Sequence, residues 1–340
     1  MNKEYTLNLA EEILKIDSPS GFTSNVIAFL KTEAERLGFK TSVTQKGNLV
    51  IEVEGESQEA RGVCAHADTL GLMVRSIKSD GKLAVTKVGG PIMNTLDGEY
   101  CRIYTRNGKV VTGTILSNSP SIHVYKDATT LERNEDTMEV RIDEVVKNKE
   151  DVEKLGICNG DFIAIDTKTQ ITPSGFIKSR FLDDKLSVAI LFSTLEMIST
   201  HKMKLSHKTY FMITVYEEVG HGGAWIPNDI TELLGVDMGC IGTDLACTEY
   251  DVSICAKDSS GPYDYDMTTK LIEIAKKEKL NYAVDIYPMY GSDVSTALKS
   301  SNNIKGALIG PGVHASHGME RSHIQAVESS IKLLIEYLSN

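Results

Sequence analysis

The sequence has no excess of basic residues and no long apolar run. Its 340 residues include 36 lysines and arginines against 47 acidic residues, a formal net charge of −11. Because proteins that bind nucleic acid usually present a basic face, this balance argues against a nucleic-acid partner. No apolar stretch approaches the roughly 20 residues that a membrane-spanning helix needs. We therefore expect no membrane partner either.

Cysteine is scarce, with six residues in a chain too long for a disulfide framework to be expected. Cys240 and Cys247 lack Cys-x-x-Cys spacing, which argues against a thiolate metal site. We expect buried free thiols, as is usual for proteins of a reducing compartment. The first residues also lack the apolar core of a signal peptide. The expected location is therefore the cytoplasm.

The chain changes character twice along its length, and it contains no internal repeat or low-complexity linker. Residues 1–70 read as two helices followed by strands. Residues 71–164 contain short alternating runs, with a strong hairpin signal at Asn107-Gly108. From residue 165 to 340, helices alternate with strands, as a mostly parallel sheet requires. The sequence therefore predicts an α/β domain, formed by 1–70 and 165–340, into which a β-rich domain at 71–164 is inserted.

Helical patterns occur in several places. They predict helices over residues 7–14, 24–37, 143–155, 182–199, 268–278 and 324–338. Trp225, the single tryptophan, follows a glycine-rich turn, and we expect it to pack in the core rather than against a substrate.

The pair Glu217-Glu218 is the most informative feature of the sequence. It follows the apolar run 210–215 and precedes a glycine-rich turn. Successive residues of a strand point to opposite faces, but where a strand ends the chain turns, and both carboxylates can face one cleft. Such a pair suits a metal site in which one acid binds the ion and the other handles protons. On its own, the pair also fits a solvated surface.

Three further fragments support a metal site. His66 and Asp68 end a strand-like run, an arrangement in which a carboxylate can orient a ligating imidazole. Asp183-Asp184 opens an apolar helical stretch, where acids serve equally well as helix caps. Three histidines fall within the short span 314–323.

A fifth candidate ligand is Asp237, which closes a short apolar run, although Asp244 competes for the same role. In open α/β sheets the strand ends are where sites assemble. Imidazole and carboxylate ligands suit Zn²⁺, Co²⁺ or Mn²⁺. Five ligands exceed the need of one zinc ion, which indicates a two-metal site with a bridging carboxylate.

In their order along the chain, these fragments resemble the glutamyl aminopeptidase and tetrahedral (TET) aminopeptidase family of dinuclear metallopeptidases. The resemblance extends from Asp17-Ser18-Pro19-Ser20-Gly21 to His317-Gly318-Met319-Glu320. It implies a phosphorylase/hydrolase-like metallopeptidase domain and a β-barrel-like dimerisation domain over 71–164. Asp183 lies 117 residues after His66, with the β-rich segment between them. That spacing favours this family over other dinuclear peptidases and deacylases, which typically place the bridging aspartate a few tens of residues after the His-x-Asp.

The resemblance also implies a role for each fragment. Two divalent ions, Zn²⁺ or Co²⁺ with Mn²⁺ also possible, would be held by His66 and Asp237 on one side, by Glu218 and His317 on the other, and by Asp183 as the bridge. Glu217 would be the general base, Asp68 would orient His66, and Asp184 would be a helix cap or a group behind the ligands. Asp237 is preferred to Asp244 because it closes the apolar run and better fits the family's spacing to Ser260-Gly261-Pro262.

Substrate contacts are implied less directly. Candidates for the specificity pocket are Tyr263, Tyr265, Tyr290, Asp293 and His314. Thr69 replaces a frequent glutamate of the family, and Lys185 replaces a frequent arginine. Neither change removes a ligand, so the chemistry carries over but the substrate preference does not.

The expected function is that of an aminopeptidase that releases N-terminal residues from peptides by means of metal-activated water. The resemblance also implies self-association, from dimers to dodecamers. Two alternatives stay open: a metal-dependent deacylase or dipeptidase acting on N-blocked or small amide substrates, and a catalytically silent metal-binding homologue.

Overall fold

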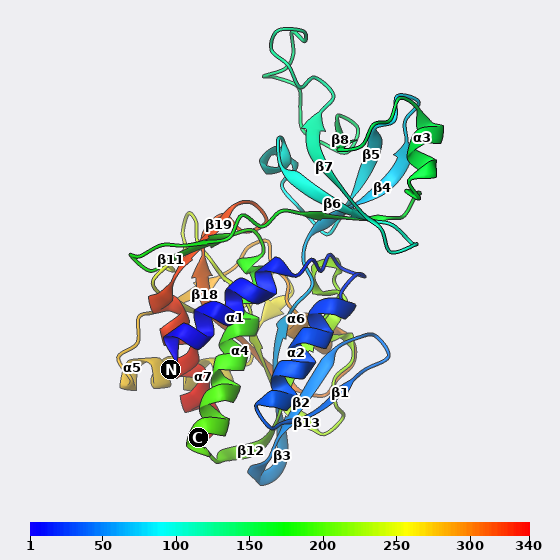
Figure 1. Ribbon diagram of the computed structural model, residues 1–340. Helices are drawn as coiled ribbons and strands as arrows, with labels where there is room; N and C mark the ends of the chain where they lie inside the picture. Colours follow the sequence, from blue (N-terminus) through cyan, green and yellow to red (C-terminus); the bar gives the residue numbers. More distant parts are fainter. The chain divides into compact units, whose positions relative to one another are not determined.

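A mixed ten-stranded sheet organises the larger of the two units into which the chain divides. The computed structural model describes residues 1–57 and 59–340. The larger unit combines Met1–Asp68 with Lys168–Asn340, and the smaller unit is Thr69–Thr167. Figure 1 shows the elements of both.

The strands of the large sheet lie in the order β1-β2-β12-β3-β13-β18-β15-β16, with β14 beside β18 and β17 beside β15. The central strands β12, β3, β13 and β18 run parallel, so their carboxyl ends meet at one edge. The bounds of the ten strands are β1 Lys40–Val43, β2 Leu49–Val53, β3 Gly55–His66, β12 Leu205–Thr214, β13 Ile230–Val236, β14 Gly239–Cys240, β15 Val252–Asp258, β16 Gly261–Pro262, β17 Tyr282–Ile286 and β18 Lys305–Val313.

Helices pack against this sheet. They are α1 Lys3–Lys15, α2 Ser24–Arg36, α4 Leu182–His201, α5 Tyr265–Lys277, α6 Asp293–Lys299 and α7 Ile324–Ser339. Helix α4 contacts both α1 and α7 and lies against β3. Its residues from Leu182 to Leu195 are all buried, and from Leu186 onward apolar side chains occupy every side of the helix. A separate three-stranded sheet contains β10 Gln170–Ile171, β11 Phe176–Ser179 and β19 Glu320–His323.

The smaller unit is a closed barrel with the strand order β4-β5-β8-β7-β6-β9. Its elements are β4 Gly71–Ile77, β5 Leu83–Val88, the 3₁₀ turn η1 Met93–Leu96, β6 Tyr100–Tyr104, β7 Val110–Ser117, β8 Met138–Ile142, α3 Lys149–Lys154 and β9 Phe162–Ile165. The hairpin predicted at Asn107-Gly108 joins β6 to β7, and Gly108 adopts the φ of +85° that the turn needs. The predicted α/β fold with a β-rich insertion is confirmed.

Two local predictions are wrong. The helix expected over 143–155 is only α3, because the side chain of Asn148 accepts the main-chain N–H of Asp151 and starts the helix there. Trp225 is 49% exposed instead of packed in the core. The six cysteines are free, and of these Cys158 is exposed. None of the described helices has the length and apolar character to span a membrane.

Lys185 ties α4 to the end of α1, and its removal should destabilise the fold. The side chain is 1% exposed, and its ammonium donates to the carbonyls of Ile13 at 2.8 Å and Ile16 at 2.6 Å. Lys185→Met keeps the volume but leaves these acceptors without their donor, at a cost of about 1–3 kcal/mol. Urea unfolding should show this loss, whereas the exposed Lys204→Met should change stability by less than about 0.5 kcal/mol. Equal stability of the two variants would contradict the structural role of Lys185.

Candidate active site

The candidate ligands gather where neighbouring parallel strands end. His66 is the last residue of β3, and Asp237 directly follows β13. Glu217 and Glu218 begin the 3₁₀ turn η2 (Glu217–Val219), just after β12. Because β12, β3 and β13 are adjacent in the sheet, the three strand ends bring these groups to one place.

Asp68 holds the acidic turn in position. The chain reverses at Tyr216, which has a φ of +69°. The Asp68 carboxylate then accepts the main-chain N–H groups of Glu217 at 3.1 Å and Glu218 at 3.3 Å. The hydroxyl of Ser20 donates to the same carboxylate. Asp68 thus fixes the backbone of both acids as well as lying beside His66.

Asp293 supports the same turn from behind. Its carboxylate accepts the hydroxyl of Thr214 and the N–H of Gly223. A Cβ at Gly223 would lie 2.2 Å from the Asp293 carbonyl oxygen, so the glycine is required by this close approach. Asp293 was a candidate substrate contact, but the structure places it beneath the turn.

The Asp183 carboxylate lies between the two imidazoles. One of its oxygens is 3.2 Å from Nε2 of His66, and the other is 3.7 Å from Nε2 of His317. Nε2 of His317 is also 3.6 Å from the Glu218 carboxylate, and Nε2 of His66 is 3.6 Å from that of Glu217. These groups therefore surround one small volume, with Asp183 at its centre.

The tautomer that His66 adopts when its ring is neutral follows from its contacts. Its Nδ1 lies 3.0 Å from the main-chain carbonyl oxygen of Asp68. A carbonyl can only accept, so Nδ1 carries the hydrogen, and Nε2 faces Asp183 with a lone pair when the ring is neutral. This is the tautomer that a metal ligand needs.

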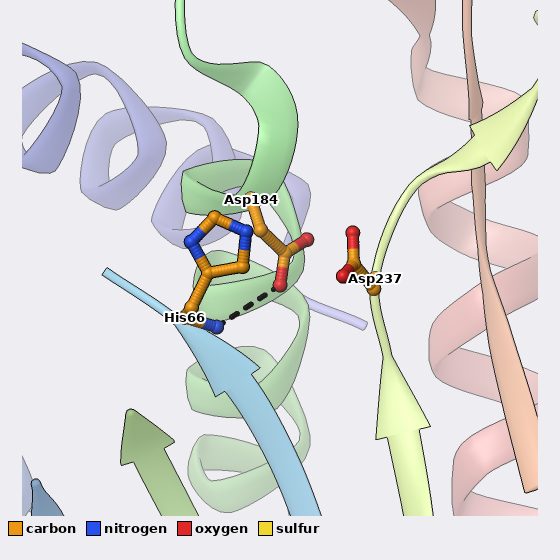
Figure 2. A group of neighbouring side chains, drawn as sticks. All are labelled: His66, Asp184 and Asp237. Atoms are coloured by element: carbon orange, nitrogen blue, oxygen red, sulfur yellow. Dashed lines mark hydrogen bonds between the residues drawn. The ribbon is translucent and has the colours of Figure 1, made fainter. Parts of the chain in front are cut away.

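Of the two roles expected for Asp184, a helix cap or a group behind the ligands, its contacts agree with the second. It is fully buried, and its carboxylate accepts the N–H of His66 at 3.1 Å. Figure 2 shows His66, Asp184 and Asp237 converging from β3, α4 and the end of β13. Ligand atoms of these three lie within 4.8 Å of one another, as do those of His66, Asp183 and Glu218.

The electrostatics of this cluster indicate a deficit of positive charge. Burial and neighbouring carboxylates raise the pKa values of Glu217 and Glu218 well above their usual range. Burial and the charge of Asp183 raise the pKa of Asp237 to about 7. Burial would lower the pKa of His66, but its hydrogen bonds to Asp183 and Asp68 raise it well above the ordinary value. Divalent cations would relieve this imbalance.

One buried oxygen also fits a metal. Among the described residues, Oε1 of Glu218 is buried without a hydrogen-bond partner. A buried carboxylate oxygen without a hydrogen-bond partner is destabilising unless a cation or a water molecule binds it. With imidazole nitrogens and carboxylate oxygens around it, the donor set suits Zn²⁺, Co²⁺ or Mn²⁺.

A cavity of about 490 Å³ opens beside the cluster. Asp183, Glu217, Glu218, Asp237 and His317 line one side, whereas His66 lies in a small crevice behind Asp237. Residues before and along α6 contribute to the rest of the lining, namely Met289, Tyr290, Gly291, Ser292, Ser295, Thr296, Lys299 and Ser300. The cavity therefore has an acidic side and a side with hydroxyl groups and a lysine.

The other candidates differ in their relation to this cavity. Tyr290 lines it. Tyr263 is buried and donates to Asp258, beside a neighbouring pocket. The structure does not bring Tyr265, which is 82% exposed, or the exposed His314 into the lining. The exposed Asp244 is also absent from the lining, unlike Asp237.

Glu320 is a residue whose role the sequence did not reveal. It is 1% exposed, and its two carboxylate oxygens accept the N–H groups of Asp183 and His317, each at 3.0 Å. It thereby joins the start of α4 to the loop before β19. The sequence pointed to Glu320 only through its position three residues after His317. A single acid at that spacing is equally typical of a solvated loop.

Comparison with known proteins gives a consistent result. A family profile described as M42 glutamyl aminopeptidase matches residues 47–333. YhfE of Bacillus subtilis (strain 168), named as a putative aminopeptidase, is 46% identical over 337 residues, covering 98% of this chain and 97% of YhfE. Glutamyl aminopeptidase of Lactococcus lactis subsp. cremoris (strain MG1363) is 27% identical over 215 residues, covering 62% of this chain and 59% of its own.

Solved structures share the fold. A TET aminopeptidase from the archaeon Thaumarchaeota archaeon SCGC AB-539-E09 superposes with a TM-score of 0.90 at 19% identity, covering 100% of this chain and 97% of its own. The TET1 peptidase of Pyrococcus horikoshii gives a TM-score of 0.85 at 24% identity, covering 98% of this chain and 99% of its own. That peptidase can assemble into a tetrahedron or a large octahedral shell.

Replacing Glu320 with glutamine should weaken metal binding. The amide has one acceptor oxygen, so its NH₂ group would face the N–H of either Asp183 or His317. Groups that orient ligands in this way are typically worth about 10–100-fold in metal affinity. Titration of the metal-free protein with Zn²⁺ should show that loss, and the exposed Glu328→Gln on α7 should not. An unchanged affinity in Glu320→Gln would show that these two hydrogen bonds do not position the ligands.

Proposed function

Because the chain belongs to the M42 glutamyl aminopeptidase family, whose members are metal-dependent enzymes that hydrolyse peptide bonds, we propose that its acidic cavity holds two divalent ions and releases N-terminal residues from peptides. The family predicted from the sequence is confirmed, as is its class of enzyme. The number of ions and the role of each residue are our proposal.

The central position of Asp183 carries the proposal. Its two oxygens face different imidazoles, one toward His66 and the other toward His317. A carboxylate that presents each oxygen to a separate nitrogen ligand is placed to bridge two ions. His66 and Asp237 would complete one ion's ligands, and Glu218 and His317 those of the other.

Glu217 is the group best placed to move a proton. Two bound Zn²⁺ or Co²⁺ ions, with Mn²⁺ also possible, would supply an acidified water and polarise the scissile carbonyl. The Glu217 carboxylate lines the same cavity and would accept the proton of that water, then return it to the leaving amine. Asp68 holds the Glu217 backbone, which limits where its carboxylate can lie.

The family match also bears on the substrate. An aminopeptidase acts on peptides with a free N-terminus, whereas an N-blocked substrate has none. The match to the M42 glutamyl aminopeptidase family therefore favours an aminopeptidase over a deacylase.

Assembly and location complete the proposal. The dodecamer and the shells named for TET1 structures belong to those proteins. We extend homo-oligomerisation to this chain, with the barrel Thr69–Thr167 as a dimerisation element. Six free thiols favour a reducing compartment, which we take to be the cytoplasm.

Substitution of the two adjacent acids, Glu217 and Glu218, should impair the enzyme in different ways. Glu217→Gln keeps its shape but cannot accept a proton, so kcat should fall on the order of 10²–10⁴-fold while two ions stay bound. Glu218→Gln should instead weaken one ion and recover part of its activity in excess metal. Emission spectroscopy for metal content and turnover of peptide p-nitroanilides, with and without added Zn²⁺ or Co²⁺, measure both effects.

The opposite pattern has a clear meaning. If Glu217→Gln loses metal while Glu218→Gln keeps it, the two roles are exchanged. If neither substitution affects turnover, the cavity is not the catalytic site. Hydrolysis of N-acetylated amino acids in place of free peptides would favour the deacylase.

Asp183→Ala removes an oxygen ligand from each proposed ion. Metal content should fall from about two to one or fewer per chain, with loss of activity. The matched variant Asp184→Ala changes the neighbouring carboxylate, which accepts a main-chain N–H instead of lying between the imidazoles. It should retain more metal than Asp183→Ala. Two tightly held ions in Asp183→Ala would refute the bridging role.

A further inference from the structure

A second hollow lies beside the acidic cavity, on the far side of a short turn. It is a groove of about 560 Å³, lined by Ser42, Val43, Thr44, Gln45, Lys46, Asn48 and Trp225. This volume falls within the range of ordinary ligand pockets, about 300–1,000 Å³. Val43 is 45% exposed and Trp225 is 49% exposed, so two large apolar side chains of this groove face solvent.

The groove adjoins the cavity through the short segment that follows the turn of the proposed base. The 3₁₀ segment η3 (Gly222–Ala224) ends at Ala224, which lines the cavity, and the next residue, Trp225, lines the groove. Lys46 of the groove donates to the carbonyl oxygen of His221, another residue of the cavity lining. The side chain of Asn48 donates to the carbonyl of Gly222 at 3.2 Å. The two hollows therefore share one segment of chain.

The backbone beside the groove can receive an extended peptide. Strand β1 (Lys40–Val43) lies at the edge of the large sheet, and among the described residues it pairs with β2 alone (Figure 1). An edge strand presents unpaired main-chain N–H and C=O groups, to which an extended peptide can add as a further strand. Ser42 and Val43 belong both to this edge and to the groove.

The groove carries a positive charge that suits the C-terminus of a peptide. Its charged residue is a lysine, Lys46, whereas the cavity carries acids on one side and Lys299 on the other. A peptide that places its N-terminal ammonium in the cavity would direct its C-terminal carboxylate toward that lysine. The ammonium group of Lys46 has three donors, and the carbonyl of His221 uses one of them.

We propose that the groove of β1, Lys46 and Trp225 binds the downstream part of short peptide substrates, with an apolar side chain against Trp225 and the C-terminal carboxylate near Lys46. This assignment rests on the proposed function, since it takes the cavity as the place where the N-terminal residue is released. It gives the enzyme a preference for extended peptides over single-residue substrates.

Kinetics against peptide length test the proposal. With a constant N-terminal residue and a leucine near the C-terminus, kcat/KM should rise about tenfold from an aminoacyl p-nitroanilide to a four- or five-residue peptide. Trp225→Ala should abolish this rise and leave hydrolysis of the p-nitroanilide within about twofold. Ile286→Ala, a similarly exposed apolar site on β17, should keep the rise. A rise that persists in Trp225→Ala would overturn the proposal.

The single tryptophan provides a readout that does not depend on turnover. In the full chain carrying Glu217→Gln, peptides without tryptophan or tyrosine should change the fluorescence of Trp225 in a saturable manner. C-terminally amidated peptides should bind more weakly than free acids, and equal binding would overturn the assignment of Lys46. A change that follows protein concentration instead of peptide would overturn the proposal and identify the groove as a contact between copies. If the unaltered enzyme cleaves no peptide while the fluorescence titration saturates, the proposed function is wrong but peptide binding in the groove is supported.

Discussion

The mutual repulsion of buried carboxylates is the constraint on which the structure of this site depends. Burying several like charges in one place is unfavourable unless hydrogen bonds or cations compensate them. Main-chain N–H groups supply part of that compensation, at Asp68 for the acidic turn and at Glu320 for the loop of His317. These hydrogen bonds do not balance all of the negative charge, above all around Glu218. Divalent ions would supply the missing positive charge. The fold thus fixes the candidate ligands through their backbones and leaves their side chains available to bind ions.

The central sheet explains why these groups can be held so closely. The parallel strands β12, β3 and β13 are adjacent, so their ends are separated by single strand spacings. The barrel is inserted between β3 and the start of α4, and the proposed ligands all lie outside it. His66 and Asp183 can therefore lie close together despite their long separation in sequence, because α4 packs against β3.

Local patterns predicted a good part of this arrangement. Acids and a histidine at the ends of apolar runs indicated His66, Glu217 and Glu218, because strand ends share one edge of a sheet. The contacts of Glu320 and Asp184 could not be predicted in this way, because each is defined by a main-chain N–H far away in the sequence. The solvent exposure of Tyr265 and Trp225 could not be predicted from the sequence either. Whether an aromatic residue near a motif packs inward or outward depends on its tertiary neighbours.

In the proposed site, chemistry and selectivity would come from different sides of the cavity. Its acidic side comes from strand ends and the start of α4, where backbone contacts leave little freedom. Its other side includes Ser292, Ser295, Thr296, Lys299 and Ser300, which recur at the three- and four-residue spacing of one face of α6. Side chains on that face can change without moving a ligand, because the helix is anchored from below by Asp293. Strand ends could be found from the sequence, so the candidate ligands were open to prediction, whereas the residues of this helix face gave no signal of a preferred substrate.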